Sequence, residues 1–200
     1  QRLHDADTLG LDIVVAVVPR DQAGIGEALH QGQHGTLCGN TPFPTWRGQN
    51  EQTMAHAAIA YAKAKKRRRA HAVTSSIGPG ATNMVTAAAL AHVNRLPVLF
   101  IAGDVFASRR PDPVLQQVED FGDGTVSAND CFRPVVRYFD RIQRPEQLLS
   151  ALPRALRVMT DPADCGPVCL AFCQDVQAEA FDWPEDFFAE RVWRIRRPEP

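Results

Sequence analysis

The sequence predicts an α/β domain with a three-layer, doubly wound and mostly parallel sheet of about six strands, and with helices on both faces. Short apolar runs rich in β-branched residues alternate along the chain with longer runs at helical spacing. The run LPVLFIAG at 96–103 is continuously apolar, which is typical of a strand covered by helices on both sides of the sheet. These observations favour a parallel sheet over an antiparallel one.

Size and composition fit one globular domain. The chain has 200 residues, of which 44% are hydrophobic and 22% charged, and its formal net charge is -1. A near-neutral chain is not expected to bind nucleic acid non-specifically, and no apolar run is long enough to cross a membrane. The N-terminus lacks the pattern of a secretory signal, and five cysteines do not form an obvious disulfide framework, so we expect a cytoplasmic location.

The first half of the chain alternates between the two kinds of element. The expected elements are a strand at 11–18, a short helix at 23–32, a loop at 33–44, a helix at 50–66, a strand at 70–76, a turn at 77–80, a helix at 81–93 and a strand at 96–103.

The second half begins irregularly and then returns to regular elements. We expect irregular structure at 104–130, a strand at 132–139, a helix from Pro145 to residue 160, a strand at 167–176 and a linker at 191–200. Pro153 falls inside the expected helix and could kink it.

The helix expected at 50–66 carries an isolated carboxylate, Glu51, in its first turn. Residues 54–62 are apolar almost all round, so we expect this helix to be buried on every side, with Asn50 as its cap. In the simplest interpretation Glu51 stabilises the helix end through the dipole, by about 0.3–1 kcal/mol. The alternative is that Glu51 has a chemical role.

A glycine turn follows the next expected strand. Gly78 and Gly80 flank Pro79, where glycine permits a positive φ or the close approach of another group. Any α/β protein needs such turns, and the spacing matches neither G-x-G-x-x-G nor G-x-x-x-x-G-K-[ST]. A dinucleotide-binding fold is the structural rival, and it predicts NAD binding at this turn.

Other patterns favour structural interpretations. The basic run KAKKRRR at 63–69 is typical of a solvated helix end rather than of a nucleic-acid site. Cys165, Cys169 and Cys173 have spacings that resemble a zinc site, but on a strand Cys169 and Cys173 act as small apolar residues. His56 and His92 are expected to be core histidines.

Two longer stretches carry a family resemblance. GQNEQTMAHAAIAYAKA and TSSIGPGATNMVTAAALAHVNRLPVLFIAGDV resemble the N-terminal, pyrimidine-binding domain of thiamine-diphosphate enzymes of the acetohydroxyacid synthase type. The shared elements are Glu-Gln at the start of an apolar helix, a Tyr-Ala pair near its end, Gly-Pro-Gly-Ala-Thr-Asn, and a Pro before a strand that ends in Gly. Within this superfamily, YFDRIQRPEQLLSALPRAL and neighbouring phrases resemble the hydrolases of inositol catabolism that open a cyclic 1,2-diketone.

The resemblance implies a catalytic role for Glu51, which would share a proton with N1′ of the cofactor's aminopyrimidine. A buried carboxylate suits this task, because an apolar setting strengthens the hydrogen bond. The resemblance also implies that Gln116 lies near the reacting carbon. It further implies that four residues in or beside the glycine turn border the cofactor: Ser75, Ser76, Gly78 and Asn83.

The same resemblance implies the cofactors and partners. The cofactor would be thiamine diphosphate with Mg²⁺, the substrate a cyclic diketone opened to 5-deoxy-glucuronate, and the assembly a homodimer or homotetramer. Residues 1–190 would form the pyrimidine-binding domain, and Mg²⁺ would be held by a diphosphate-binding domain absent from this chain. Gly122, Asp123 and Gly124 imitate that domain's metal motif, but no Asn follows at the required distance, so we expect a loop there.

Two alternatives stay open beside this hypothesis. One is a related enzyme that acts on 2-oxo acids, and the other is an inactive dimerisation fragment.

Overall fold

The computed structural model describes residues 15–16, 45–46 and 48–189, and the helix predicted at 23–32 and the linker predicted at 191–200 lie outside them. The sheet is parallel at every strand pair. Its order is β2 (Thr45–Trp46), β1 (Val15–Ala16), β3 (Ala72–Ser75), β4 (Leu99–Asp104), β6 (Val168–Cys173) and β5 (Tyr138–Ile142). The first two of these strands have two residues each, and the other four have between four and six. The predicted parallel α/β class is confirmed.

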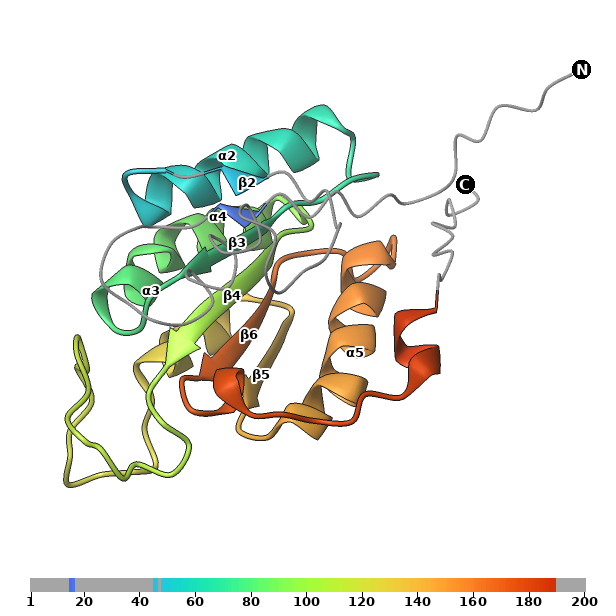
Figure 1. Ribbon diagram of the computed structural model, residues 1–200. Coiled ribbons are helices and arrows are strands. Elements are labelled where there is room, and N and C mark those ends of the chain that lie inside the picture. Colours follow the sequence, from blue (N-terminus) through green and yellow to red (C-terminus); the bar gives the residue numbers. More distant parts are fainter. Residues whose placement is uncertain (1–14, 17–44, 47, 190–200) are drawn as a thin grey trace, which may run out of the picture.

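Helices cover both faces of the sheet, as Figure 1 shows. One face carries α2 (Glu51–Ala64), α3 (Pro79–Asn83), α4 (Val85–Val93) and the 3-10 helix η1 (Ala128–Val135). The other carries α5 (Leu148–Thr160), which follows the short η2 (Pro145–Gln147). Two short turns, η3 (Val176–Ala178) and η4 (Glu185–Phe188), follow β6. None of the helices in the described ranges is long and apolar enough to cross a membrane.

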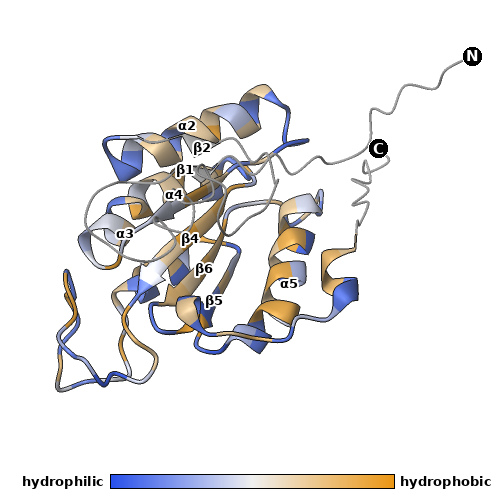
Figure 2. Ribbon diagram, viewed as in Figure 1, coloured by the Kyte–Doolittle hydropathy of each residue, from blue (hydrophilic) through white to orange (hydrophobic). Residues whose placement is uncertain are grey.

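Alternate residues of the central strands feed two separate cores. Phe100 of β4 and Cys169 of β6 pack under α2 and α4, whereas Leu99 and Leu170 pack under α5. The strands are therefore apolar on both faces, which is visible as their hydrophobic colour in Figure 2. Cys169 and Cys173 are fully buried in this sheet, as expected of small apolar residues.

Helix α2 is buried along one stripe, so the prediction that it is buried on every side is wrong. Its buried residues are Met54, Ala55, Ala58, Ile59 and Ala62. The opposite stripe, which includes Thr53, Ala57 and Ala60, is exposed. Alanine presents little apolar area to water, so this stripe needs no cover. The predicted cap is confirmed, because Asn50 Oδ1 accepts a hydrogen bond of 3.0 Å from Thr53 N.

Two further boundaries differ from prediction. The strand predicted at 132–139 is wrong, since η1 occupies Ala128–Val135 and β5 begins only at Tyr138. A capping box starts η1, with Asn129 N donating to Ser127 Oγ and Ser127 N donating to Asp130 Oδ2. The helix predicted at 81–93 begins earlier, at Pro79, and is interrupted at Met84 between α3 and α4. Helix α5 continues through Pro153.

Candidate functional site

The predicted site residues gather where β3 ends. Parallel strands bring their carboxyl ends to one edge of a sheet, which is where open α/β folds bind ligands. At this edge β3 leads into the glycine turn and α3, and α2 begins beside them (Figure 1).

Glu51 and Asn83 form the centre of this group. Asn83 Nδ2 donates to Glu51 Oε2 at 2.8 Å, which joins the first turn of α2 to the end of α3. Both side chains are half-buried, so Glu51 is less enclosed than predicted because it occupies the outer end of its helix. Within the part of the chain that the structure describes, Asn83 is the one hydrogen-bond donor to the Glu51 carboxylate. The other oxygen, Oε1, accepts no hydrogen bond from the described residues.

Gly80 keeps the space beside Glu51 open. A Cβ at residue 80 would stand 2.5 Å from Ser76 Oγ and 3.4 Å from Glu51 Oε1. The structure therefore brings the side chains of Ser76 and Glu51 close to the same glycine. Ser75 lies one residue earlier and is buried, and its hydroxyl donates to Ser76 O at 3.1 Å. That hydroxyl serves the turn itself.

Gly78 joins the turn to a distant loop. Its φ is +60°, and a Cβ there would collide with the carbonyl oxygen of Gln116. Gln116 also has a positive φ of 64°, a conformation that costs a non-glycine residue about 1 kcal/mol or more and is enriched at functional sites. The backbone of Gln116 thus lies against the glycine turn. The roles of all six residues stay predictions.

A second polar group, which sequence reasoning missed, lies further along the same edge. Asp104 ends β4 with its side chain 0% exposed. Arg141 of β5 donates to this carboxylate from Nε at 2.8 Å and from a second guanidinium nitrogen at 3.3 Å. Ser127 Oγ lies 3.2 Å from both carboxylate oxygens. A polar residue directly after the apolar strand at 96–103 was the available signal.

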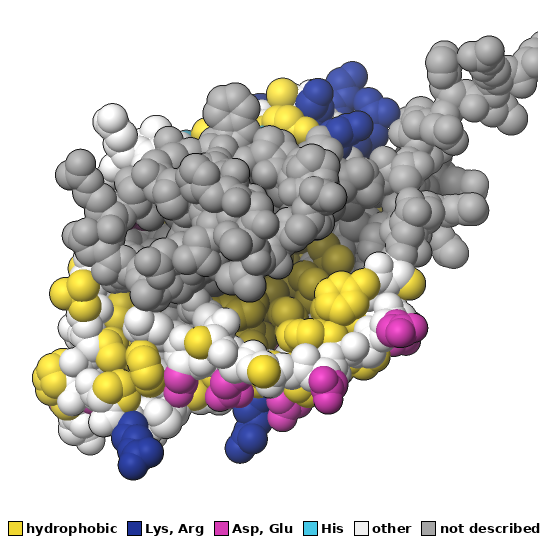
Figure 3. Space-filling model, viewed as in Figure 1, with side chains coloured by type: hydrophobic (Ala, Val, Ile, Leu, Met, Phe, Trp, Pro, Cys, Tyr) yellow, Lys and Arg dark blue, Asp and Glu magenta, His cyan; other side chains and the backbone are white. Residues whose placement is uncertain are grey.

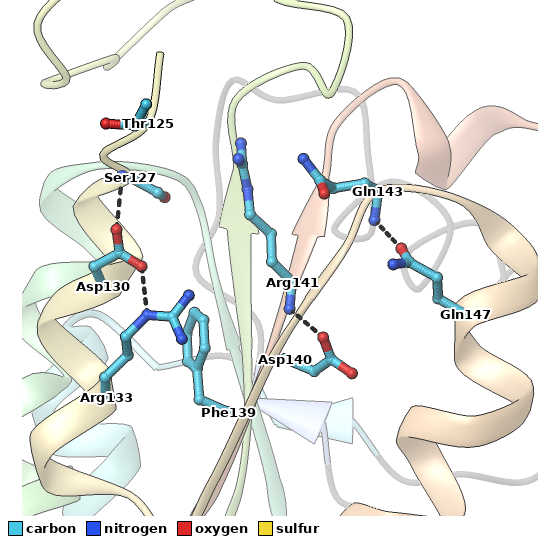
Figure 4. A pocket seen from close by; sticks show the side chains of 9 residues that line it. All are labelled: Thr125, Ser127, Asp130, Arg133, Phe139, Asp140, Arg141, Gln143 and Gln147. Carbon is cyan, nitrogen blue, oxygen red and sulfur yellow. Dashed lines mark hydrogen bonds and ion pairs between the residues drawn. The ribbon is translucent and has the colours of Figure 1, made fainter. Parts of the chain in front are cut away.

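Beside this second group is a cavity of about 320 Å³. Figure 4 shows Arg141 and Arg133 projecting into it from β5 and η1, together with Gln143 and Gln147. Arg133 Nε donates to Asp130 at 2.7 Å, and its guanidinium lies 4.4 Å from the centre of the Phe139 ring. Both arginines of the cavity are therefore already paired with protein carboxylates.

The charges of these pairs reinforce one another. Burial alone would lower the pKa of Arg141, but the neighbouring Asp104 carboxylate raises that pKa above its ordinary value. Burial raises the pKa of Asp130, and hydrogen bonds from Ser127 N and Arg133 outweigh it, leaving the pKa below its ordinary value. In Arg141 and in Asp130 the pKa is therefore displaced in the direction that favours the charged form.

The imitation metal motif is an exposed loop, as predicted. Asp123 accepts hydrogen bonds from the backbone and hydroxyl of Thr125, at 2.9 and 2.5 Å. Its carboxylate is committed to this turn. Among the described residues no group of three or more His, Cys, Asp or Glu side chains could hold a metal ion.

Comparison with known proteins finds one family whose sequence pattern matches this region. Residues 37–123 match the family described as thiamine pyrophosphate enzyme, N-terminal TPP binding domain. This range includes Glu51, the glycine turn and Gln116.

Several curated relatives share one name, 3D-(3,5/4)-trihydroxycyclohexane-1,2-dione hydrolase. The protein of Geobacillus thermodenitrificans is 55% identical over 177 residues, which is 88% of this chain and 27% of the relative. The proteins of Clostridium perfringens and Listeria monocytogenes are 54% and 51% identical, again over 88% of this chain and 26% and 27% of the relatives. The chain thus spans about a quarter of the length of these relatives.

Proposed function

We propose that this chain belongs to the N-terminal TPP-binding family of thiamine pyrophosphate enzymes and that it supplies the pyrimidine-binding half of an active site that cleaves a C–C bond. The observation that carries the proposal is the Glu51–Asn83 pair, in which Oε1 of Glu51 lies beside Gly80 and accepts no hydrogen bond from the described residues. The TPP-binding part of the proposal rests on the family match, and the reaction rests on the relatives' names.

The residues present fit the pyrimidine ring of the cofactor. A flat heterocycle needs a carboxyl group that can share a proton with a ring nitrogen, and a neighbouring surface without side chains. Glu51 provides the first, and Gly80 provides the second, since a Cβ there would stand 3.4 Å from Glu51 Oε1 and would narrow the space beside the carboxylate. Thiamine diphosphate, when bound, supplies the carbon nucleophile for attack on a carbonyl group.

Each residue of this chain then has a defined task. The Asn83 amide N–H donates to Glu51 Oε2 and restricts rotation of the Glu51 side chain, which fixes the direction in which Oε1 points. Glu51 accepts or gives up a proton at the ring nitrogen, a step worth roughly 10²–10⁴-fold in rate. The loop that contains Gln116 borders the reacting region from the side of Gly78.

The substrate we propose is the one in the relatives' name, trihydroxycyclohexane-1,2-dione, opened by hydrolysis to 5-deoxy-glucuronate. Diphosphate and Mg²⁺ contacts would come from outside this chain, in a homodimer or homotetramer. The buried, unpaired thiols of Cys165, Cys169 and Cys173 suit a reducing compartment such as the cytoplasm.

A chimaeric enzyme tests this proposal. The matching segment of the Geobacillus relative is replaced by this chain, and turnover of the cyclic dione is measured against that of a 2-oxo acid. Glu51→Gln should lower kcat by roughly 10²–10⁴-fold. The matched control is Glu146→Gln, which changes an exposed carboxylate in the first turn of η2 and should leave kcat unaltered.

Equal losses in the two variants would mean that Glu51 only stabilises a helix end. Preferred turnover of the 2-oxo acid would favour the related synthase or decarboxylase reaction. For the 200-residue chain alone we expect weak cofactor binding, and submicromolar affinity by calorimetry with Mg²⁺ would contradict the division of the site between domains.

A further inference from the structure

The long loop between β4 and η1 is closed at its base by side chains. Asp104 is the last residue of β4, and Ser127 is the N-cap of η1. Ser127 Oγ lies 3.2 Å from both oxygens of the Asp104 carboxylate, so one hydroxyl ties the two ends of residues 105–126 together. The Asp104 carboxylate also accepts the backbone N–H of Val105 at 2.8 Å.

A buried ion pair fixes this closure to the sheet. The Asp104 side chain is fully buried, and Arg141 grips it with two guanidinium nitrogens from β5. Asn129, also buried, donates to Gly103 O at 2.8 Å and binds the start of η1 to the end of β4. A planar guanidinium on a carboxylate constrains direction as well as distance. We call Asp104, Ser127 and Arg141 the base clamp.

Two further carboxylates hold the loop just beyond the base clamp. Asp175, which follows β6, accepts the backbone N–H groups of Ala107 at 2.8 Å and Ser108 at 3.2 Å. Glu119 accepts the N–H of Ala128 at 2.8 Å. Both ends of the loop are therefore anchored by polar bonds to the rigid part of the domain.

Core packing does not hold the rest of the loop. Four of its large apolar side chains are exposed, by 64% for Leu115, 55% for Val118, 59% for Phe121 and 54% for Val126. Figure 3 shows hydrophobic side chains gathered at the lower left of the surface, where Figure 1 draws this loop. Yet the loop places the carbonyl of Gln116 against Gly78. The anchors at the base of the loop fix the direction in which it leaves the sheet toward this contact.

We propose that Asp104, Ser127 and Arg141 are positioning residues that hold the loop, and with it Gln116, over the glycine turn of the active site. This inference rests on the proposed function for the role of Gln116. The base clamp does not contact the glycine turn. It positions Gln116 by fixing the direction in which the loop leaves the sheet.

Hydrogen exchange in the 200-residue chain tests the clamp directly. Ser127→Ala removes the hydroxyl bond to a buried charge, so amides of residues 105–126 should exchange roughly tenfold faster. Amides of β6 should be unaffected. The matched control is Ser150→Ala, which removes an exposed hydroxyl bonded to Gln147 O in the α5 region and should leave the loop unchanged. Unchanged loop exchange in Ser127→Ala, or equal acceleration in the loop and in β6, would overturn the proposal.

Substitution of Arg141 provides a conservative rescue. Arg141→Lys keeps a positive charge near Asp104 but loses the two-nitrogen grip, so the loop should exchange more slowly than in Arg141→Ala and faster than in the unaltered chain. Equal exchange in the two variants would remove Arg141 from the clamp. If Arg141→Ala does not fold, Ser127→Ala and Arg141→Lys still decide the question.

Turnover by the chimaera separates positioning from general stability. Ser127→Ala should lower kcat roughly tenfold with KM unchanged, because a small displacement of a reacting group costs rate more than binding. A normal kcat in a variant whose loop exchanges faster would overturn the positioning role. An unaltered chimaera without turnover would count against the proposed function alone, and the exchange experiment would still decide whether the clamp holds the loop.

Discussion

Glu51 and Asp104 are both carboxylates at the carboxyl edge of the sheet, yet their surroundings are opposite. Asp104 is fully buried and receives a guanidinium, a hydroxyl and a backbone N–H. Glu51 is half-buried, and among the described residues it receives one neutral amide donor. A carboxylate with every lone pair engaged fixes structure, whereas one with an open oxygen can exchange a proton with a ligand. The contrast separates a structural acid from a chemical one.

The largest effect should come from breaking the Asp104 pair. Arg141→Ala leaves a buried charge without its partner, so the free energy of unfolding should fall by about 3–5 kcal/mol. Arg133→Ala is the matched control in the same cavity, because the Arg133 side chain is 59% exposed. In Arg133→Ala the free energy of unfolding should fall by less than about 2 kcal/mol, even with the Phe139 contact included. Urea unfolding followed by circular dichroism measures the free energy of unfolding of both variants. Similar losses would contradict the structural role of the Asp104–Arg141 pair.

A smaller effect is expected at Glu51. Glu51→Gln keeps an oxygen for the Asn83 amide and removes only the charge that favours a helix N-terminus, worth about 0.3–1 kcal/mol. The same urea experiment should therefore show nearly unchanged stability in a variant whose turnover has collapsed. A stability loss above about 2 kcal/mol would assign Glu51 to the structural class with Asp104.

The smallest effect should be a dependence on pH at Asp175. Burial raises the pKa of Asp175, but the hydrogen bonds from Ala107 N and Ser108 N outweigh it, so the pKa is below its ordinary value of 3.8. A depressed pKa means that this anchor is fully present above the unfolded-state value and is lost as pH falls through the lower folded value. The anchor should thus loosen only below about pH 4.

An NMR titration of the Ala107 and Ser108 amides follows this anchor, and Asp175→Asn should abolish the response. Asp161 is a matched control, since N–H groups of Asp164 and Ala163 also lower its pKa within an exposed turn. Its titration should leave the loop amides unchanged. Loop amides that respond in Asp175→Asn as before would contradict the assignment.

Local patterns in the sequence predicted the part of the site made by neighbours along the chain. The cap at Asn50, the start of α2 at Glu51 and the turn around Gly78 follow from residue preferences that act over a few positions. Their assembly at one edge follows from the parallel sheet, which the alternating pattern also indicated.

The base clamp could not be predicted in the same way. Ser127 lies 23 positions after Asp104, and Arg141 lies 37 positions after it. Only the folded chain brings the three side chains together. The apolar run VV at 135–136 favoured a strand, but the capping box at Ser127 turned the chain into η1 first. Local hydrogen bonds prevailed there over β propensity.

The contact between Gly78 and Gln116 has a consequence for how sequence change can be tolerated here. The turn and the loop meet without room for one extra carbon atom, so lengthening or bulk on either side must be matched on the other. Substitutions in the turn and in the loop should therefore occur in correlated pairs among homologues. A chimaera that exchanges one of the two segments should fold only when the other segment is exchanged with it.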